Sequence, residues 1–254
     1  MPRHVYLALG DSITAGIGSS HPSLSFVRHL SEFLQKKSIA DRTISVAQHG
    51  WTAKDLFQVT STLTSIPWDE VRFTTLSLGS SDLVRLLRPQ RFSLSGDPFE
   101  PRSVAKKADE FGYHTDKLFR WVKEKEVPEV VTTTLYNPFP VFPIAQQFVE
   151  GMNMIIKDCS SYYGFTVVDV QKTFLNREPY LIHGYRTGNI QDLLYPRSKP
   201  VFPNNAGHLE MANLVIRQLE KQSKQAPKTK QVLKRKYPIK TVGGMKSSKR
   251  TSGR

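Results

Sequence analysis

Short apolar runs alternate along the chain with longer segments in which apolar residues recur every three or four positions. The short runs predict five strands, over Val5–Leu9, Thr43–Ala47, Phe73–Leu78, Val130–Leu135 and Thr166–Val170. The longer segments predict helices over Leu24–Lys36, Ala53–Leu63, Val104–Glu124, Ile144–Tyr163 and Gly207–Lys221. Alternating strands and helices predict an α/β fold with a doubly wound parallel sheet, whose sites lie at the carboxyl ends of the strands.

Composition narrows the class of protein. The chain has 254 residues and is 39% hydrophobic, which is enough for one sizeable core. Cys159 is the only cysteine, so an intrachain disulfide and a cysteine metal cluster are both excluded. The spacing of His, Asp and Glu indicates no metal site, and we expect no cofactor. No apolar run has the length of a signal peptide core or a membrane span, so we expect a soluble, cytoplasmic protein.

The positive charge is concentrated at the end of the chain. Residues 221–254 contain twelve Lys and Arg and no acidic residue, and so carry +12 of the formal net charge of +14. We therefore expect a nearly neutral domain over residues 1–220 and a basic, disordered tail over 221–254. Such a tail is attracted to polyanions such as nucleic acid, anionic lipid or an anionic polymer; a merely solubilising extension is the alternative.

One motif carries chemistry. The first predicted strand leads directly into GDSITAG, residues 10–16. A serine at a sharp turn after a strand is lifted above the sheet edge, where its hydroxyl can meet a substrate. Ser12 is therefore a candidate nucleophile, with Asp11 bracing the turn through backbone hydrogen bonds. An ordinary Gly-Asp-Ser turn is the alternative, and the position directly after the first strand favours the functional interpretation.

Three further stretches follow in order: QHGWTAKDL after the second strand, LSLGSSDL after the third, and FPNNAGH before the last helix. With GDSITAG, they resemble the blocks of the SGNH/GDSL hydrolases, a family of esterases and lipases, over about residues 4–220. The resemblance implies a three-layer α/β/α, flavodoxin-like fold with a five-stranded parallel sheet. It also implies a small acyl-ester substrate, Ser12 as nucleophile, and an oxyanion hole formed by the backbone N–H groups of Ser12 and Gly50.

The chain departs from the family pattern at three positions. Ser81 stands where the family has an oxyanion-hole asparagine, Phe202 where it has the catalytic histidine, and Lys199 where it has the acid. A phenyl ring cannot accept a proton, and an ammonium group cannot orient an imidazole as a carboxylate does. The resemblance thus implies an esterase whose activity is weakened or lost. A catalytically inactive cleft protein, anchored through its basic tail, is the alternative.

Another histidine could replace the missing base. His208 matches the second, non-catalytic histidine of the family ending, so it is either a relocated base or a structural residue of the last helix. His183 could form a dyad with Asp192, or be an ordinary surface residue. His49 and His21 are expected near the cleft rim, either contacting substrate or simply half-exposed at the end of an element.

Overall fold

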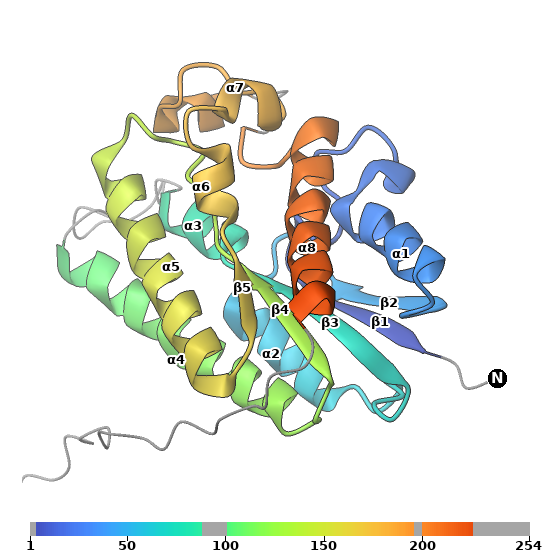
Figure 1. Cartoon of the computed structure of the whole chain (residues 1–254). Helices are drawn as coiled ribbons and strands as arrows, with labels where there is room; N and C mark the ends of the chain where they lie inside the picture. Colours follow the sequence, from blue (N-terminus) through green and yellow to red (C-terminus); the bar gives the residue numbers. More distant parts are fainter. Residues whose placement is uncertain (1–3, 88–100, 196–199, 226–254) are drawn as a thin grey trace, which may run out of the picture.

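The computed structural model describes residues 4–87, 101–195 and 200–225 (Figure 1). Its centre is one sheet of five strands: β1 Val5–Gly10, β2 Arg42–Ala47, β3 Val71–Ser77, β4 Glu129–Thr133 and β5 Thr166–Val168. All neighbouring strands are parallel, in the order β2-β1-β3-β4-β5. The predicted five-stranded parallel sheet is confirmed.

Helices cover both faces of the sheet. The long ones are α1 Phe26–Lys36, α2 Ala53–Thr62, α4 Pro101–Lys123, α5 Pro143–Tyr163 and α8 Asn205–Gln225. One face is covered by α1 and α8, which pack against each other, and the other by α2, α4 and α5 (Figure 1). The predicted three-layer α/β/α fold is confirmed.

Five short elements add to these at the edges of the layers. They are α3 Ser80–Leu87, α6 Val170–Phe174, α7 Glu178–Leu181 and the 3-10 helices η1 Pro22–Leu24 and η2 Ile190–Leu194. Because α3 and α6 follow β3 and β5 directly, they begin at the carboxyl edge of the sheet, near the predicted site.

The last helix extends further than its apolar pattern predicts. It continues through residues 221–225, which were expected to begin the disordered tail. Lys and Gln are good helix formers, and extending an existing helix is far easier than starting one. Residues 226–254 and Lys199 lie outside the described residues. None of the helices in the described ranges is both long and apolar enough to cross a bilayer.

Strand register brings three chain segments together at the carboxyl edge. Gly10, the last residue of β1, pairs with Ala47 of β2 on one side and with Ser77 of β3 on the other. The three strands therefore end at the same level, and the loops that follow them emerge side by side. These loops carry the GDSITAG, QHGWTAKDL and LSLGSSDL motifs.

Candidate active site

The turn that carries Ser12 requires a glycine before it. A Cβ at Gly10 would overlap the side chain of Thr14 and the carbonyl oxygen of Ser77, so the backbone of β1 can pass this close to β3 only without a side chain. Ser12 follows two residues later and is only 1% exposed. Its environment is therefore set by protein groups and not by bulk water.

Asp11 stabilises this turn through hydrogen bonds within the turn and to the start of α3. One carboxylate oxygen accepts the N–H of Ile13 at 3.0 Å, and the other accepts the N–H and the hydroxyl of Ser80 at 2.8 and 2.7 Å. Burial raises the pKa of the Asp11 carboxyl, and the hydrogen bonds from Ser80 and Ile13 oppose that rise. The carboxylate thus joins the Ser12 turn to the start of α3.

Three groups converge on the Ser12 hydroxyl: two come from the loop after β2, and one comes from the start of α3, after β3. The backbone N–H of Gly50 donates to Oγ at 3.0 Å. The hydroxyl of Ser81 lies 3.3 Å from Oγ, and Nδ1 of His49 lies 3.1 Å from it. Ser12 therefore contacts both predicted oxyanion-hole positions and, in addition, an imidazole nitrogen.

The loop that presents His49 and Gly50 is held from two directions. Gly50 has a φ of 86°, in the left-handed region that favours glycine. Arg85 of α3 donates from Nη2 to the carbonyl oxygen of Gly50 and to Asp55, both at 3.0 Å. Asp55 also closes a capping box with Thr52, which fixes the start of α2 directly after the loop.

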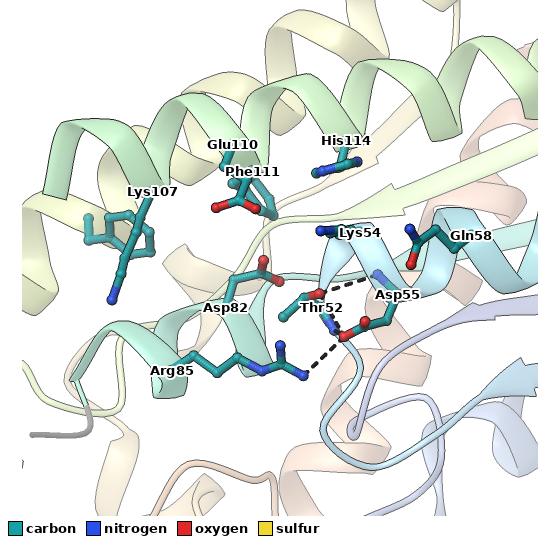
Figure 2. Close-up of a pocket in the computed structure, with 11 residues that line it drawn as sticks. Thr52, Lys54, Asp55, Gln58, Asp82, Arg85, Lys107, Glu110, Phe111 and His114 are labelled. Atoms are coloured by element: carbon teal, nitrogen blue, oxygen red, sulfur yellow. Dashed lines mark hydrogen bonds and ion pairs between the residues drawn. The ribbon is translucent and has the colours of Figure 1, made fainter. Parts of the chain in front are cut away.

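Asp82 links α3 to the start of α2, directly after this loop. One of its carboxylate oxygens accepts the N–H of Ala53 at 3.0 Å. Burial raises the pKa of Asp82 to about 7; the hydrogen bond from Ala53 opposes the rise, and the nearby Asp11 adds to it. Figure 2 shows this carboxyl facing a cavity between α2, α3 and α4.

Phe202 lies next to the site without taking part in hydrogen bonding through its ring. The ring packs edge-on against His49, with 5.6 Å between the ring centroids, and the residue is only 8% exposed. Position 202, which carries a histidine in the family pattern, thus contacts the same imidazole ring that contacts Ser12. Lys199, which stands where the family has the acid, lies outside the described residues.

His208 lies in the first turn of α8 and is completely buried. Its Nδ1 accepts the N–H of Phe26 at 3.3 Å, and its Nε2 lies 3.2 Å from the carbonyl oxygen of Ile17. Burial lowers its pKa to about 4, so the ring is neutral at pH 7. Both ring nitrogens hold α8 against the segment after Ser12, and neither hydrogen-bonds to Ser12.

His183 and Asp192 do not form a dyad in this structure. His183 is exposed, and its backbone N–H donates to the carbonyl oxygen of Phe202 at 2.8 Å. The Asp192 carboxylate is buried and accepts hydrogen bonds from Thr187 and Gly188, within its own loop. The fourth candidate, His21, is exposed and bonds to its near neighbour Ser23.

A sequence comparison decides the family. Residues 8–209 match the GDSL-like Lipase/Acylhydrolase family. The chain belongs to this family. No curated protein sequence matches it significantly.

Solved structures with the GDSL-type fold agree with this assignment. A lipase from a goat rumen metagenome superposes with a TM-score of 0.66 at 19% identity, covering 84% of this chain and 96% of that one. An acetylxylan esterase from Geobacillus stearothermophilus gives a TM-score of 0.59 at 19% identity, covering 86% and 96%. A lipolytic G-D-S-L family protein from Veillonella parvula gives 0.57 at 14% identity, covering 84% and 97%. At these identities the likeness shows the shared fold.

The contact between His49 and Ser12 is the feature that the family pattern does not predict. In that pattern the block around Gly50 supplies a backbone donor, and the histidine before it has no assigned role. The pairing of β1 with β2 could have indicated this contact. Gly10 pairs with Ala47, and Ser12 and His49 each follow their paired residue by two positions, so both emerge at the same edge of the sheet. Among the described residues, no group of three or more His, Cys, Asp or Glu is arranged to hold a metal ion.

Proposed function

We propose that this GDSL-family protein is a carboxylic ester hydrolase in which Ser12 is the nucleophile and His49 is the general base. The observation that carries the proposal is the 3.1 Å separation between Ser12 Oγ and His49 Nδ1. That distance is within the range expected of a nucleophile and its base. When the neutral imidazole carries its proton on Nε2, Nδ1 can accept the hydrogen of the Ser12 hydroxyl.

The reaction then runs in two halves. Ser12 Oγ attacks the ester carbonyl carbon while its proton moves to Nδ1 of His49, and the resulting oxyanion is stabilised by donors beside Oγ. The N–H of Gly50 and the hydroxyl of Ser81 are the donors that already contact Oγ. The imidazolium next gives its proton to the departing alcohol, which leaves an acyl-Ser12. A water molecule, deprotonated by His49, releases the carboxylic acid and restores both residues.

The proposed dyad lacks the third member of a full triad. Among the described residues, no carboxylate hydrogen-bonds to His49. An acid normally orients the imidazole and stabilises its charged form, and its replacement in another serine hydrolase costs about 10⁴ in kcat. We therefore propose a slow esterase: the base is present at a new position, while the acid and the oxyanion-hole asparagine are missing.

The solved relatives agree with a serine and histidine chemistry on this fold. In the Geobacillus acetylxylan esterase, a Ser-to-Ala and a His-to-Ala variant are each described as catalytic mutants. The competing proposal, a cleft protein without turnover, predicts that Ser12 reacts no faster than an ordinary serine.

Labelling by a fluorophosphonate probe and hydrolysis of 4-nitrophenyl acetate test the proposal together. We expect both in the wild-type protein and neither in Ser12→Ala. In His49→Ala we expect kcat to fall by about 10² or more, because an unassisted hydroxyl is a poor nucleophile. Added imidazole should restore part of the His49→Ala rate, which a merely structural role for His49 would not explain.

His183→Ala is the matched control, because it removes a histidine that lies near Phe202 but does not contact Ser12. We expect it to hydrolyse 4-nitrophenyl acetate at the wild-type rate. A folded wild-type protein that is neither labelled nor active would instead support the inactive cleft. Activity that survives in His49→Ala but is lost in His183→Ala would move the base to the second histidine.

A further inference from the structure

Little of the protein packs around Gly50, the residue that presents its N–H to Ser12 Oγ. A Cβ at this position would meet no atom within 4 Å, and the two residues before it, Gln48 and His49, are exposed. Gly50 also has a φ of 86°, and a glycine changes its backbone conformation more easily than any other residue. Packing therefore contributes little to the direction of the Gly50 N–H, and hydrogen bonds have to determine it.

Gly50 is hydrogen-bonded through both of its peptide groups. Its N–H donates to Ser12 Oγ at 3.0 Å, and its carbonyl oxygen accepts from Nη2 of Arg85, also at 3.0 Å. Because each peptide group is planar, holding the groups on both sides of a residue restrains its φ and ψ together. The bond to Ser12 weakens once the N–H donates to an oxyanion instead, so the bond from Arg85 is the one that can hold the peptide during a reaction.

Arg85 is in turn oriented by Asp55. The same Nη2 donates to Asp55 Oδ2 at 3.0 Å, and Asp55 closes the capping box at the start of α2 (Figure 2). Burial opposes the ionisation of Asp55, but hydrogen bonds from Thr52 and the charge of Arg85 lower the pKa of its carboxyl below the usual value. An ion pair with one side chain 60% exposed contributes little to folding stability. What the pair supplies is a fixed direction for the guanidinium.

Arg85 and Ser81 lie one turn apart on α3, and residues four apart share a face of a helix. From this face the Ser81 hydroxyl contacts Ser12 Oγ at 3.3 Å, while Arg85 binds the Gly50 carbonyl. The helix itself is tied to the start of α2, because Asp82 accepts the N–H of Ala53. One short helix therefore sets where both proposed oxyanion donors lie relative to each other.

We propose that Arg85 is a positioning residue of this site, which holds the Gly50 N–H in the direction in which the oxyanion of the ester forms. This inference rests on the proposed ester hydrolysis at Ser12. Arg85 acts through the Gly50 peptide and not on the substrate. A donor to the oxyanion matters most in the transition state, so a misplaced Gly50 N–H should lower kcat and leave KM nearly unchanged.

Arg85→Met tests this role, since it removes the guanidinium and keeps an unbranched side chain. We expect kcat for 4-nitrophenyl acetate to fall by about tenfold to 10²-fold, because a misplacement of about 1 Å can cost about 10². Arg85→Lys should recover only part of this loss, since an ammonium group lacks the planar fork of donors. Ethylguanidinium chloride, added to Arg85→Met at a concentration that does not unfold the protein, should also restore part of kcat. An unchanged kcat in Arg85→Met, or a loss confined to KM, would overturn the proposal.

Arg28→Met is the matched control. The Arg28 side chain is 59% exposed and pairs with Glu32 on α1 at 3.2 Å, so this variant also breaks one exposed ion pair of an arginine. We expect it to hydrolyse 4-nitrophenyl acetate at the wild-type rate and not to respond to ethylguanidinium. An equal loss of kcat in Arg28→Met and Arg85→Met would contradict a specific role of Arg85.

Amide hydrogen exchange of residues 48–52 separates the two proposals, because it does not depend on turnover. We expect exchange to be about tenfold faster in Arg85→Met than in the wild-type protein or Arg28→Met, since a hydrogen bond to a charged group is lost. Faster exchange in a protein that turns over no ester would refute the esterase and leave Arg85 as the residue that holds the loop. Turnover by the wild-type protein, with kcat and exchange both unchanged in Arg85→Met, would do the reverse. A lower kcat without faster exchange would also contradict positioning, because the charge of Arg85 would then act on the site directly.

Discussion

At the scale of single residues, the proposed base His49 lies far in the chain from position 202, where the family pattern has its histidine, but close to that position in the structure. The family pattern puts the histidine at position 202, and this chain puts a phenyl ring there that touches the ring of His49. A base reaching Ser12 from the end of β2 therefore occupies space next to the one that a histidine at 202 would use.

This proximity gives a test of whether the older arrangement can be rebuilt. In a His49→Ala background, adding Phe202→His together with Lys199→Asp should raise the hydrolysis of 4-nitrophenyl acetate by about 10² or more over His49→Ala alone, because a base and its acid are returned together. Phe202→His without Lys199→Asp should recover less. No gain in either protein, with the fold intact by circular dichroism, would show that position 202 cannot reach Ser12.

The sequence predicted the residues of this site that stand in recognisable motifs, and it did not predict the contact of His49 with Ser12. Ser12, Gly50 and Ser81 stand in motifs from which their proposed roles were expected, and the structure brings all three into contact. His49 has no such mark, because its importance depends on β1 and β2 being neighbours with Gly10 opposite Ala47. Pairing between strands that are far apart in the chain is not visible in local periodicity.

At the scale of elements, length decided which helices could be predicted. The five long helices repeat their apolar positions over several turns, and all five were expected within a few residues of their observed bounds. The helices α3, α6 and α7 have eight, five and four residues, which is too short for a period to emerge. They form because of tertiary contacts, such as the hydrogen bonds from Ser80 to Asp11 at the start of α3.

The docking of α8 depends on a histidine that must stay neutral. The pKa of His208 is about 4 in the folded protein, against about 6.5 in an unfolded chain. Between these values the unfolded chain takes up a proton that the folded protein does not, so acid favours unfolding. The contribution of neutral His208 is present above pH 6.5 and is lost as the pH falls towards 4.

His208→Gln removes this titration and so isolates its effect. We expect the free energy of unfolding of the wild-type protein, minus that of His208→Gln, to fall by about 3 kcal/mol between pH 6.5 and pH 4, as measured by urea unfolding. Asp82, whose pKa is raised to about 7, has the opposite pH dependence, but it is present in both proteins and cancels in the difference. A difference for His208→Gln that stays constant over this pH range would contradict the neutral, buried assignment.

At the scale of the whole molecule, alternating periodicity was enough to predict the layers and the number of strands. The strand order was not predicted, because right-handed and short crossovers reduce the ways to wind five parallel strands without selecting one. The charge distribution is a separate property: +12 of the net +14 belongs to residues 221–254, and the rest of the chain is almost neutral.

The end of the chain is therefore expected to determine how the protein interacts with polyanions. Removing residues 226–254 takes away ten of the twelve basic side chains of the tail while keeping α8 to its observed end. We expect the full chain to be retained on heparin in a salt-dependent way and the shortened chain to elute much earlier, because counterion release scales with the number of cations. Equal retention of the two proteins would refute this role, and an unchanged rate on 4-nitrophenyl acetate would show that the domain is intact.

The adjacency of His49 and Gly50 has a consequence for how the activity can vary. One dipeptide supplies both the proposed proton acceptor and the donor to the oxyanion, and Arg85 holds it through the carbonyl of Gly50. A displacement of this loop would therefore remove the proposed base and one of the proposed oxyanion donors together, and would leave only the hydroxyl of Ser81 in contact with Oγ. In a triad spread over distant segments, each function can weaken separately. Here two of them belong to adjacent residues, so we expect changes in this loop to weaken proton transfer and oxyanion binding at the same time.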